Sequence, residues 1–338
     1  MRLVILFFIF IGSFSATGQQ YSKCKVHTNA EGLMQLSNAG IPVDHGIQKK
    51  NTFFISDFSE REIQIMKNLN FKVDILIDDV KKFYRERAAQ NIETRNASCE
   101  SNETPLPTVP DHFKLGTMAG FYTYQEYIDE LDEMFATYPN LISEKKNISN
   151  FSTHEGRPIY WLKISDNPNN DESEPEVLYS SIHHAREPLS LTNTIFYMWY
   201  LLENYATNPE IKYLLDETEL YFIPMLNPDG YVQNETADPN GGGLWRKNKR
   251  NNNDGTFGVD LNRNYSYQWG TTGVSPNTGN DTYPGTGPFS EPETQAMKWF
   301  CENREFQFAF NAHTYSNLIL FPIGATTNDF AADHDYFQ

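Results

Sequence analysis

Long apolar runs, cysteine and positive charge are all scarce in this 338-residue sequence. After the first 18 residues, no stretch has the roughly 20 consecutive apolar residues that a membrane-spanning helix needs. The three cysteines show no Cys-x-x-Cys spacing and none is adjacent to a histidine, so catalysis by a thiol is not expected. The 27 Lys and Arg residues against 44 Asp and Glu residues give a net charge of −17, which argues against nucleic acid or an anionic membrane as the main partner.

The first 18 residues have the pattern of a secretory signal peptide. Arg2 precedes an unbroken apolar run over residues 3–11, and small residues precede the expected cleavage site before Gln19. The alternative is a membrane anchor, but the apolar run is well short of the length of a spanning helix. We therefore expect residues 1–18 to be removed and the protein to be secreted, to an extracellular or periplasmic location.

The rest of the chain divides into two units joined by a linker. Residues 19–89 have the pattern of a small α+β domain, in which Ser59-x-x-Glu62 is a capping box that begins a helix. Residues 90–111 are rich in Asn, Glu, Ser, Thr and Pro, which is typical of an exposed linker that proteases reach easily. Residues 112–338 form the second unit. In the first unit we expect strands at 21–27, 51–56 and 71–77 and helices at 30–39, 59–69 and 79–89.

Strands and helices alternate from about residue 120 onward, which is typical of an α/β sheet with helices on its faces. The last helix is expected to begin at the capping box Ser290-x-x-Glu293. The expected strands are 159–164, 176–182, 220–226, 306–312 and 318–323, and the expected helices are 124–136, 190–205 and 290–305. Several charged residues of this unit are interpreted as solvated: Lys247, Lys249, Arg250, Glu291 and Glu293.

Two of the expected strands lead directly into histidines. Strand 176–182 is followed by His183, His184 and, three residues later, Glu187, and strand 306–312 is followed by His313. Ligands of open α/β sheets bind outside the carboxyl ends of the strands, so these side chains fall where a site is expected. Two neutral imidazoles and one carboxylate form a ligand set that suits catalytic zinc. The His-x-x-Glu spacing alone is a weak signal, and the two strand ends are what favour a metal site; His183 is interpreted as structural.

Beginning near Phe121, the chain resembles the zinc metallocarboxypeptidases of the carboxypeptidase A/B type (peptidase family M14). The matching segments follow the family's order, at similar spacing, over about two hundred residues. They are Glu155-Gly156-Arg157-Pro158-Ile159-Tyr160, Ile182 through Glu187, Asn227-Pro228-Asp229-Gly230-Tyr231, Leu244-Trp245-Arg246-Lys247, Gly258-Val259-Asp260-Leu261-Asn262-Arg263-Asn264 and His313-Thr314-Tyr315-Ser316.

The resemblance implies a fold and a metal centre. The fold would be α/β, with a mixed, mostly parallel central sheet and helices on both faces, preceded by a small α+β domain that resembles a propeptide. His184, Glu187 and His313 match the family's three zinc ligands, which hold one Zn²⁺ ion per chain. Asp260 matches a carboxylate that orients a zinc-bound histidine, since a metal-bound imidazole needs its other nitrogen fixed by an acceptor.

The resemblance also implies residues that contact the substrate. Arg246 matches the arginine that polarises the scissile carbonyl and stabilises the oxyanion. Asn262 and Arg263 match the pair that holds the terminal carboxylate of a peptide, which a guanidinium grips with two parallel hydrogen bonds. Arg186 is expected to line the cleft, with a surface ion pair as the alternative. Tyr315 either lines the outer cleft or only packs.

Two further groups that the resemblance implies are not found in the sequence. The family uses a glutamate as general base and a tyrosine that closes over the substrate, both well after the second zinc histidine. Only 25 residues follow His313 in the 338-residue sequence, so we expect the reading frame to continue beyond Gln338. The residue at the base of the specificity pocket is expected in the same part, so basic, aliphatic and aromatic preferences are not separated.

Taken together, these features predict a secreted zinc-dependent metallocarboxypeptidase that removes C-terminal residues from peptides or proteins by metal-promoted attack of water. One alternative is a non-catalytic zinc- or peptide-binding member of the family, if the chain truly ends at Gln338. Another is an amidase or peptidase that acts on peptidoglycan-derived peptides. The N-terminal unit either covers the cleft or assists folding until the linker is cut, or it is a permanent accessory domain.

Overall fold

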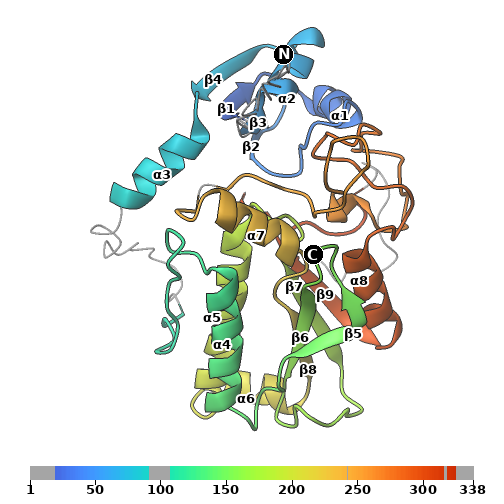
Figure 1. Ribbon diagram of the computed structural model, residues 1–338. Coiled ribbons are helices and arrows are strands. Elements are labelled where there is room, and N and C mark those ends of the chain that lie inside the picture. Colours follow the sequence, from blue (N-terminus) through green and yellow to red (C-terminus); the bar gives the residue numbers. More distant parts are fainter. Residues whose placement is uncertain (1–19, 91–106, 242, 316–317, 325–338) are drawn as a thin grey trace, which may run out of the picture.

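The computed structural model describes residues 20–90, 107–241, 243–315 and 318–324, which form two units. The smaller N-terminal unit lies above one edge of the larger unit's sheet (Figure 1). Among the described residues, the chain contains no helix with the length and apolar character needed to cross a membrane. The expected signal peptide and most of the expected linker lie outside the described residues.

The N-terminal unit is a four-stranded antiparallel sheet covered by helices. Its strand order is β2-β3-β1-β4, formed by β1 (Tyr21–Val26), β2 (Ile47–Lys49), β3 (Phe53–Ser59) and β4 (Val73–Ile77). Its helices are α1 (Ala30–Asn38), α2 (Glu60–Asn68) and α3 (Val80–Gln90). The predicted capping box is confirmed, because the Ser59 hydroxyl accepts a hydrogen bond from the Glu62 backbone while the Glu62 carboxylate accepts one from the Ser59 backbone. Val26, Leu36 and Phe54 are in the core of this unit.

The larger unit is built on a five-stranded mixed sheet. Its order is β5-β6-β8-β7-β9, in which β7 pairs in parallel with β8 and β9 and the other pairings are antiparallel. The central strand β8 is buried along its whole length, as its apolar sequence requires. The strands are β5 (Lys146–Ser152), β6 (Pro158–Ile164), β7 (Glu176–Ser181), β8 (Glu219–Ile223) and β9 (Phe306–Ala312).

Helices cover both faces of this sheet, and each face has its own apolar core. On one face α4 (Tyr124–Thr137) and α5 (Pro188–Asn204) pack on the strands around Trp199 and Phe222, while α8 (Pro292–Glu302) covers the other face through Phe300 (Figure 1). The remaining helices are α6 (Pro209–Asp216) and α7 (Pro228–Ala237). The expected α/β fold with a mixed central sheet, helices on both faces and a preceding α+β unit is therefore confirmed. The expected parallel majority is not seen among the described strands, because two of the four pairings are antiparallel.

Two predicted elements differ from the structure. The last helix begins at Pro292 with Glu291 as its N-cap and without a side-chain cap, so the capping box predicted at Ser290 is wrong. The Ser290 hydroxyl instead donates a hydrogen bond to the Glu291 carboxylate at 2.6 Å, and it does not cap a backbone N–H group of the helix. Residues 318–323, predicted as a strand on apolar composition alone, do not form one.

The loop that joins α1 to β2 is a contact between the N-terminal unit and the larger unit, and it lies at the sheet edge where β7 and β9 end. Gly40 has a φ of 79°, and a Cβ atom there would lie 2.6 Å from the Ser275 Cβ, so only glycine permits this approach. The Gly40 carbonyl accepts a hydrogen bond from the Thr282 hydroxyl at 2.9 Å. On the outer side, Arg85 of α3 forms an ion pair with Asp238. These contacts hold residues 41–46 over the larger unit.

Candidate metal centre

The parallel pairing of β7 with β9 brings the predicted metal ligands together. Ser181 lies opposite Ala312 in the register, so the residues that follow both strands leave the sheet at the same edge. The next residue, Ile182, has a φ of 52°, a left-handed conformation that is uncommon for a β-branched side chain. Strained backbone of this kind is concentrated at functional sites, and here it directs the chain from the strand into His184.

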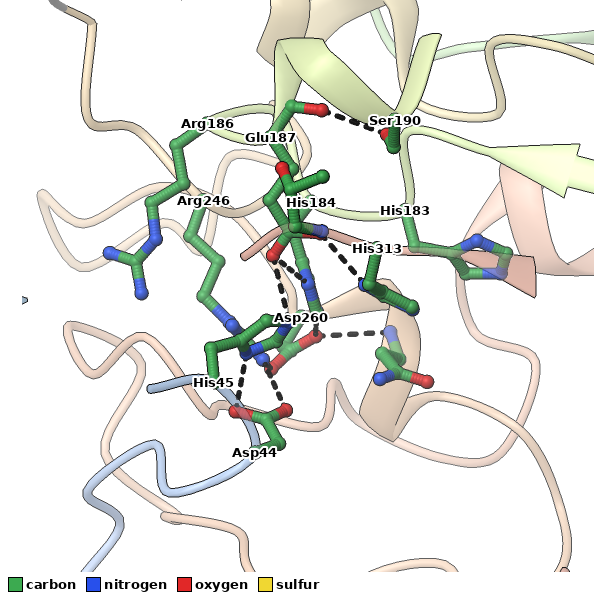
Figure 2. A network of polar contacts seen from close by, with 12 residues as sticks. Asp44, His45, His183, His184, Arg186, Glu187, Ser190, Arg246, Asp260 and His313 are labelled. Carbon is green, nitrogen blue, oxygen red and sulfur yellow. Dashed lines mark hydrogen bonds and ion pairs between the residues drawn. The ribbon is translucent and has the colours of Figure 1, made fainter. Parts of the chain in front are cut away.

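Three predicted side chains meet at this edge (Figure 2). The His184 Nδ1 atom lies 2.7 Å from one carboxylate oxygen of Glu187, and the His313 Nδ1 atom lies 2.8 Å from the other. Glu187 is the N-cap of α5, where the partial positive charge of the helix terminus favours a carboxylate. The resulting group is buried except for part of His313.

A fourth side chain, His45 of the N-terminal unit, joins this group. Its Nε2 atom lies 3.0 Å from the Glu187 carboxylate, and its ring centre lies 5.1 Å from that of His184 and 5.4 Å from that of His313. The four residues each offer one ligand atom, and these atoms lie within 4.8 Å of one another. His45 could not be predicted from the sequence, because the dipeptide Asp44-His45 lies in a loop that has no periodic pattern or family motif.

The chemistry of these donors fits zinc. Imidazole nitrogens and a carboxylate oxygen are preferred zinc ligands, and the ligating imidazole must be neutral. Burial holds the pKa of His313 below its ordinary value, which favours the neutral ring. Burial alone would raise the pKa of Glu187, but the adjacent His184, His313 and His45 outweigh it and hold that pKa well below its ordinary value, so the carboxylate is ionised.

Asp260 contacts both Arg246 and the group of His45, His184, Glu187 and His313, which is called the metal group below. One oxygen of its buried carboxylate lies 3.2 Å from the His184 Nε2 atom, as expected for an acceptor that orients a metal-bound imidazole. The other oxygen accepts hydrogen bonds from Nε and Nη2 of Arg246 at 3.1 and 2.9 Å. Arg246 is 1% exposed, and its Nη1 atom has no hydrogen-bond partner among the described residues. This buried, unsatisfied donor lies beside the metal group.

The two predicted carboxylate-binding residues lie in a short 3-10 helix, Leu261–Arg263, that Asp260 caps. Asn262 and Arg263 line a hollow of about 840 Å³, together with residues that include Tyr265 and Trp269. The Arg263 Nη2 atom donates a hydrogen bond to the Asp44 carboxylate at 2.8 Å. The same Asp44 oxygen lies 3.1 Å from Arg246 (Figure 2). A carboxylate of the N-terminal unit is therefore held between both arginines.

Arg186 and Tyr315 lie on a second hollow, of about 580 Å³, which His45 and Glu187 also line. Arg186 forms an ion pair with Asp281 at 2.8 Å, and this pair is largely buried, unlike the surface ion pair that was the alternative. The Tyr315 ring lies 5.1 Å from the Lys23 ammonium group of β1. Both residues therefore lie where the N-terminal unit meets the larger one.

His183 points away from the metal group (Figure 2). Its Nε2 atom lies 2.7 Å from the Tyr265 hydroxyl. This position matches the structural interpretation that the sequence suggested.

Three residues that were interpreted as solvated are buried, so that interpretation is wrong for them. Lys247 is 3% exposed, and its ammonium group donates a hydrogen bond to the Thr278 carbonyl. Glu291 and Glu293 are fully buried because the start of α8 packs against the segment that contains Asn248. Glu291 is compensated there by ionic or hydrogen-bond partners: Asn248, His154, Arg250 and Ser290.

Comparison with known proteins was consistent with this geometry. The family model described as zinc carboxypeptidase matches residues 127–338. A metallocarboxypeptidase A from Trichophyton rubrum is 32% identical over 302 residues, which is 84% of this chain and 68% of that protein. Carboxypeptidase O from Bos taurus is 39% identical over 180 residues, which is 52% of this chain and 46% of that protein. The chain spans about half the length of several of the curated relatives that it matches.

Solved structures match the fold over most of the chain. The carboxypeptidase A from Helicoverpa armigera has a TM-score of 0.67 at 24% identity, covering 88% of this chain and 70% of that one. Thrombin-activatable fibrinolysis inhibitor has a TM-score of 0.66 at 21% identity, covering 94% of this chain and 77% of that one. Motif order, the arrangement of side chains at the strand ends and the family match all agree, and the chain belongs to the zinc carboxypeptidase family.

Proposed function

We propose that the protein is a secreted metallocarboxypeptidase that removes the C-terminal residue from peptides or proteins. The observation that carries this proposal is the carboxylate of Asp44, which lies between Arg246 and Arg263 immediately beside the metal group. A carboxylate held there by the chain itself indicates how the terminal carboxylate of a substrate would bind. Secretion rests on the signal-peptide pattern of residues 1–18.

In this proposal the larger unit, residues 112–338, supplies the groups that bind and orient the peptide. Arg263, with Asn262 beside it, grips the terminal carboxylate, which requires a free C-terminus. Arg186 and Tyr315 line the part of the cleft beyond the metal group and contact the rest of the peptide. The grip fixes the last peptide bond relative to the metal group, so attack on that bond becomes effectively unimolecular.

Arg246 then stabilises charge that develops during the reaction. Its Nη1 atom, which has no hydrogen-bond partner among the described residues, is a buried donor that needs no rearrangement to meet an oxyanion, since Asp260 already fixes the guanidinium through two hydrogen bonds. The same aspartate fixes the ring of His184, which with Glu187 and His313 would hold the zinc ion. Zinc bound by such ligands lowers the pKa of a coordinated water and polarises a carbonyl group.

The general base is proposed to come from residues that follow position 338. Among the described residues, the carboxylates nearest the metal group are already engaged: Glu187 faces three imidazoles, and Asp260 and Asp44 pair with arginines. The chain matches several curated relatives over only about half of their length. This leaves room for a further segment that supplies a glutamate and a tyrosine.

The N-terminal unit, residues 19–89, is proposed to act as a propeptide that blocks the cleft, and residues 90–111 as the linker that is cut. Asp44 takes the place of the substrate carboxylate on Arg263, so an intact chain excludes the substrate. The match to the Trichophyton rubrum protein covers 84% of the chain and so includes part of this unit. A permanent accessory domain would instead leave the cleft blocked in every form of the protein.

The test uses the protein translated from the whole reading frame, including any residues after Gln338, with its linker cut by protease. It is incubated with matched peptides that carry either a free or an amidated C-terminus, and products are identified by mass spectrometry. We expect single residues to be released from free C-termini only, and only after the linker is cut. Release from both peptides, or cleavage of peptidoglycan-derived amides alone, would favour the amidase alternative. Zinc binding with no cleavage would favour a non-catalytic member.

A further inference from the structure

We propose that His45 is a fourth protein ligand of the metal, supplied by the N-terminal unit. The inference rests on the proposed function, because it assumes that His184, Glu187 and His313 bind zinc. It goes further in one respect: the N-terminal unit closes the coordination shell of the metal itself, in addition to occupying the carboxylate-binding arginine. The intact chain then has three imidazoles and one carboxylate on the ion.

The position of the His45 ring carries the proposal. Its Nε2 atom lies 3.0 Å from the Glu187 oxygen that also faces His184, so it points into the same small volume as the other ligand atoms. Its ring packs against the rings of both other histidines, at 5.1 and 5.4 Å between centres. The His45 side chain is only 14% exposed, so water competes little for this nitrogen.

The neighbouring Asp44 holds the ring in the orientation that a ligand needs. One Asp44 oxygen lies 2.9 Å from the His45 Nδ1 atom and accepts its hydrogen, so in the neutral ring the lone pair is on Nε2, the atom that faces the metal group. This carboxylate–histidine pair repeats the relation between Asp260 and His184 on the other side of the site. Metal-bound histidines characteristically have such a partner for the second nitrogen.

The backbone on both sides of the dipeptide is also fixed. Before it, Gly40 lies against Ser275 and is hydrogen-bonded by Thr282. After it, Gly46 has a φ of 144°, and a Cβ atom there would lie 2.4 Å from the Ile55 carbonyl oxygen, so the loop turns sharply against β3. The loop that carries His45 therefore has little conformational freedom, so the position of the ring is preorganised for binding a metal ion.

A fourth protein ligand changes what the metal site can do. Zinc sites with three protein ligands keep a position for water and are catalytic, whereas sites with four protein ligands are closed. With His45 bound, the position needed by a nucleophilic water is taken. Cutting the linker and removing the N-terminal unit opens that position and frees the two arginines from Asp44 at the same time.

The test counts the imidazoles on the metal by X-ray absorption at the zinc edge, in the purified protein from the whole reading frame with its linker intact. We expect three imidazoles in the unaltered chain and two in His45→Ala. The matched control is His27→Ala, a histidine of the same unit whose ring pairs with Asp74, and it should keep three. The count in the unaltered chain needs no variant, so it stands even if a substituted chain fails to fold.

A second readout is the rate at which a chelator removes the zinc. It should rise at least 10-fold in His45→Ala and stay unchanged in His27→Ala, because removal of a ligand costs more than removal of a group that only orients one. Two imidazoles in the unaltered chain would overturn the proposal and leave His45 a hydrogen-bond partner of Glu187, with the proposed function intact. A chain that binds no stoichiometric zinc would overturn both.

Discussion

Replacing His313 by alanine is expected to lower the zinc affinity of the chain more than 100-fold. His313 is one of the three proposed ligands of the larger unit, and its Nδ1 atom lies 2.8 Å from the Glu187 carboxylate. Loss of groups that merely orient a ligand already costs about 10–100-fold in metal affinity, so loss of a ligand should cost more. Stoichiometry and affinity are measured by metal analysis after dialysis against a competing chelator.

A matched control for this variant is His112→Ala, in the same unit. His112 lies away from the metal group, where its Nδ1 atom is 2.8 Å from the Glu203 carboxylate. It should retain one zinc per chain. If His313→Ala retains tightly bound zinc as well, His313 is not a ligand and the assignment of the site fails.

Replacing Arg263 by alanine is expected to raise KM for peptides with free C-termini by about 100-fold. The guanidinium already grips a carboxylate in the structure, that of Asp44 at 2.8 Å. A hydrogen bond to a charged group contributes about 1.5–3 kcal/mol, and two such bonds to a terminal carboxylate, each at the lower end of that range, account for a factor of about 100. KM should change more than kcat, because the contact with the terminal carboxylate is present in both the bound substrate and the transition state.

This experiment uses the protein from the whole reading frame after the linker has been cut, so that Asp44 no longer occupies the arginine. Arg304→Ala is the matched control, because Arg304 stacks on the Phe300 ring, away from the metal group. Its kinetics should be unchanged. Unaltered KM in Arg263→Ala, with normal zinc content, would remove the role of carboxylate anchor.

The part of the site that lies on regular structure could be predicted from the sequence. His184, Glu187 and His313 follow two strands, and parallel strands end at a common edge, so their meeting depends only on β7 and β9 being neighbours. Asp260 and Arg263 were recognised through the family motif, and the structure places Asp260 against His184 and Arg263 against Asp44.

The residues that sequence analysis missed or misjudged depend on contacts between distant segments. Asp44 and His45 reach the site because an entire domain docks over the sheet edge, and their local sequence carries no sign of that docking. The charged residues Lys247, Glu291 and Glu293 were expected on the surface, since charged side chains are rarely buried without partners. Their partners come from loops far along the chain, which no local pattern reveals.

The central claim is that one zinc ion lies at the carboxyl ends of β7 and β9. The most direct measurement is anomalous diffraction at the zinc edge from crystals of the zinc-loaded chain. The account predicts a single strong peak about 2.0–2.2 Å from Nδ1 of His184, Nδ1 of His313 and the Glu187 carboxylate. A peak elsewhere, such as at the buried group of His154, Glu291 and Glu293, or no peak at all, would contradict it.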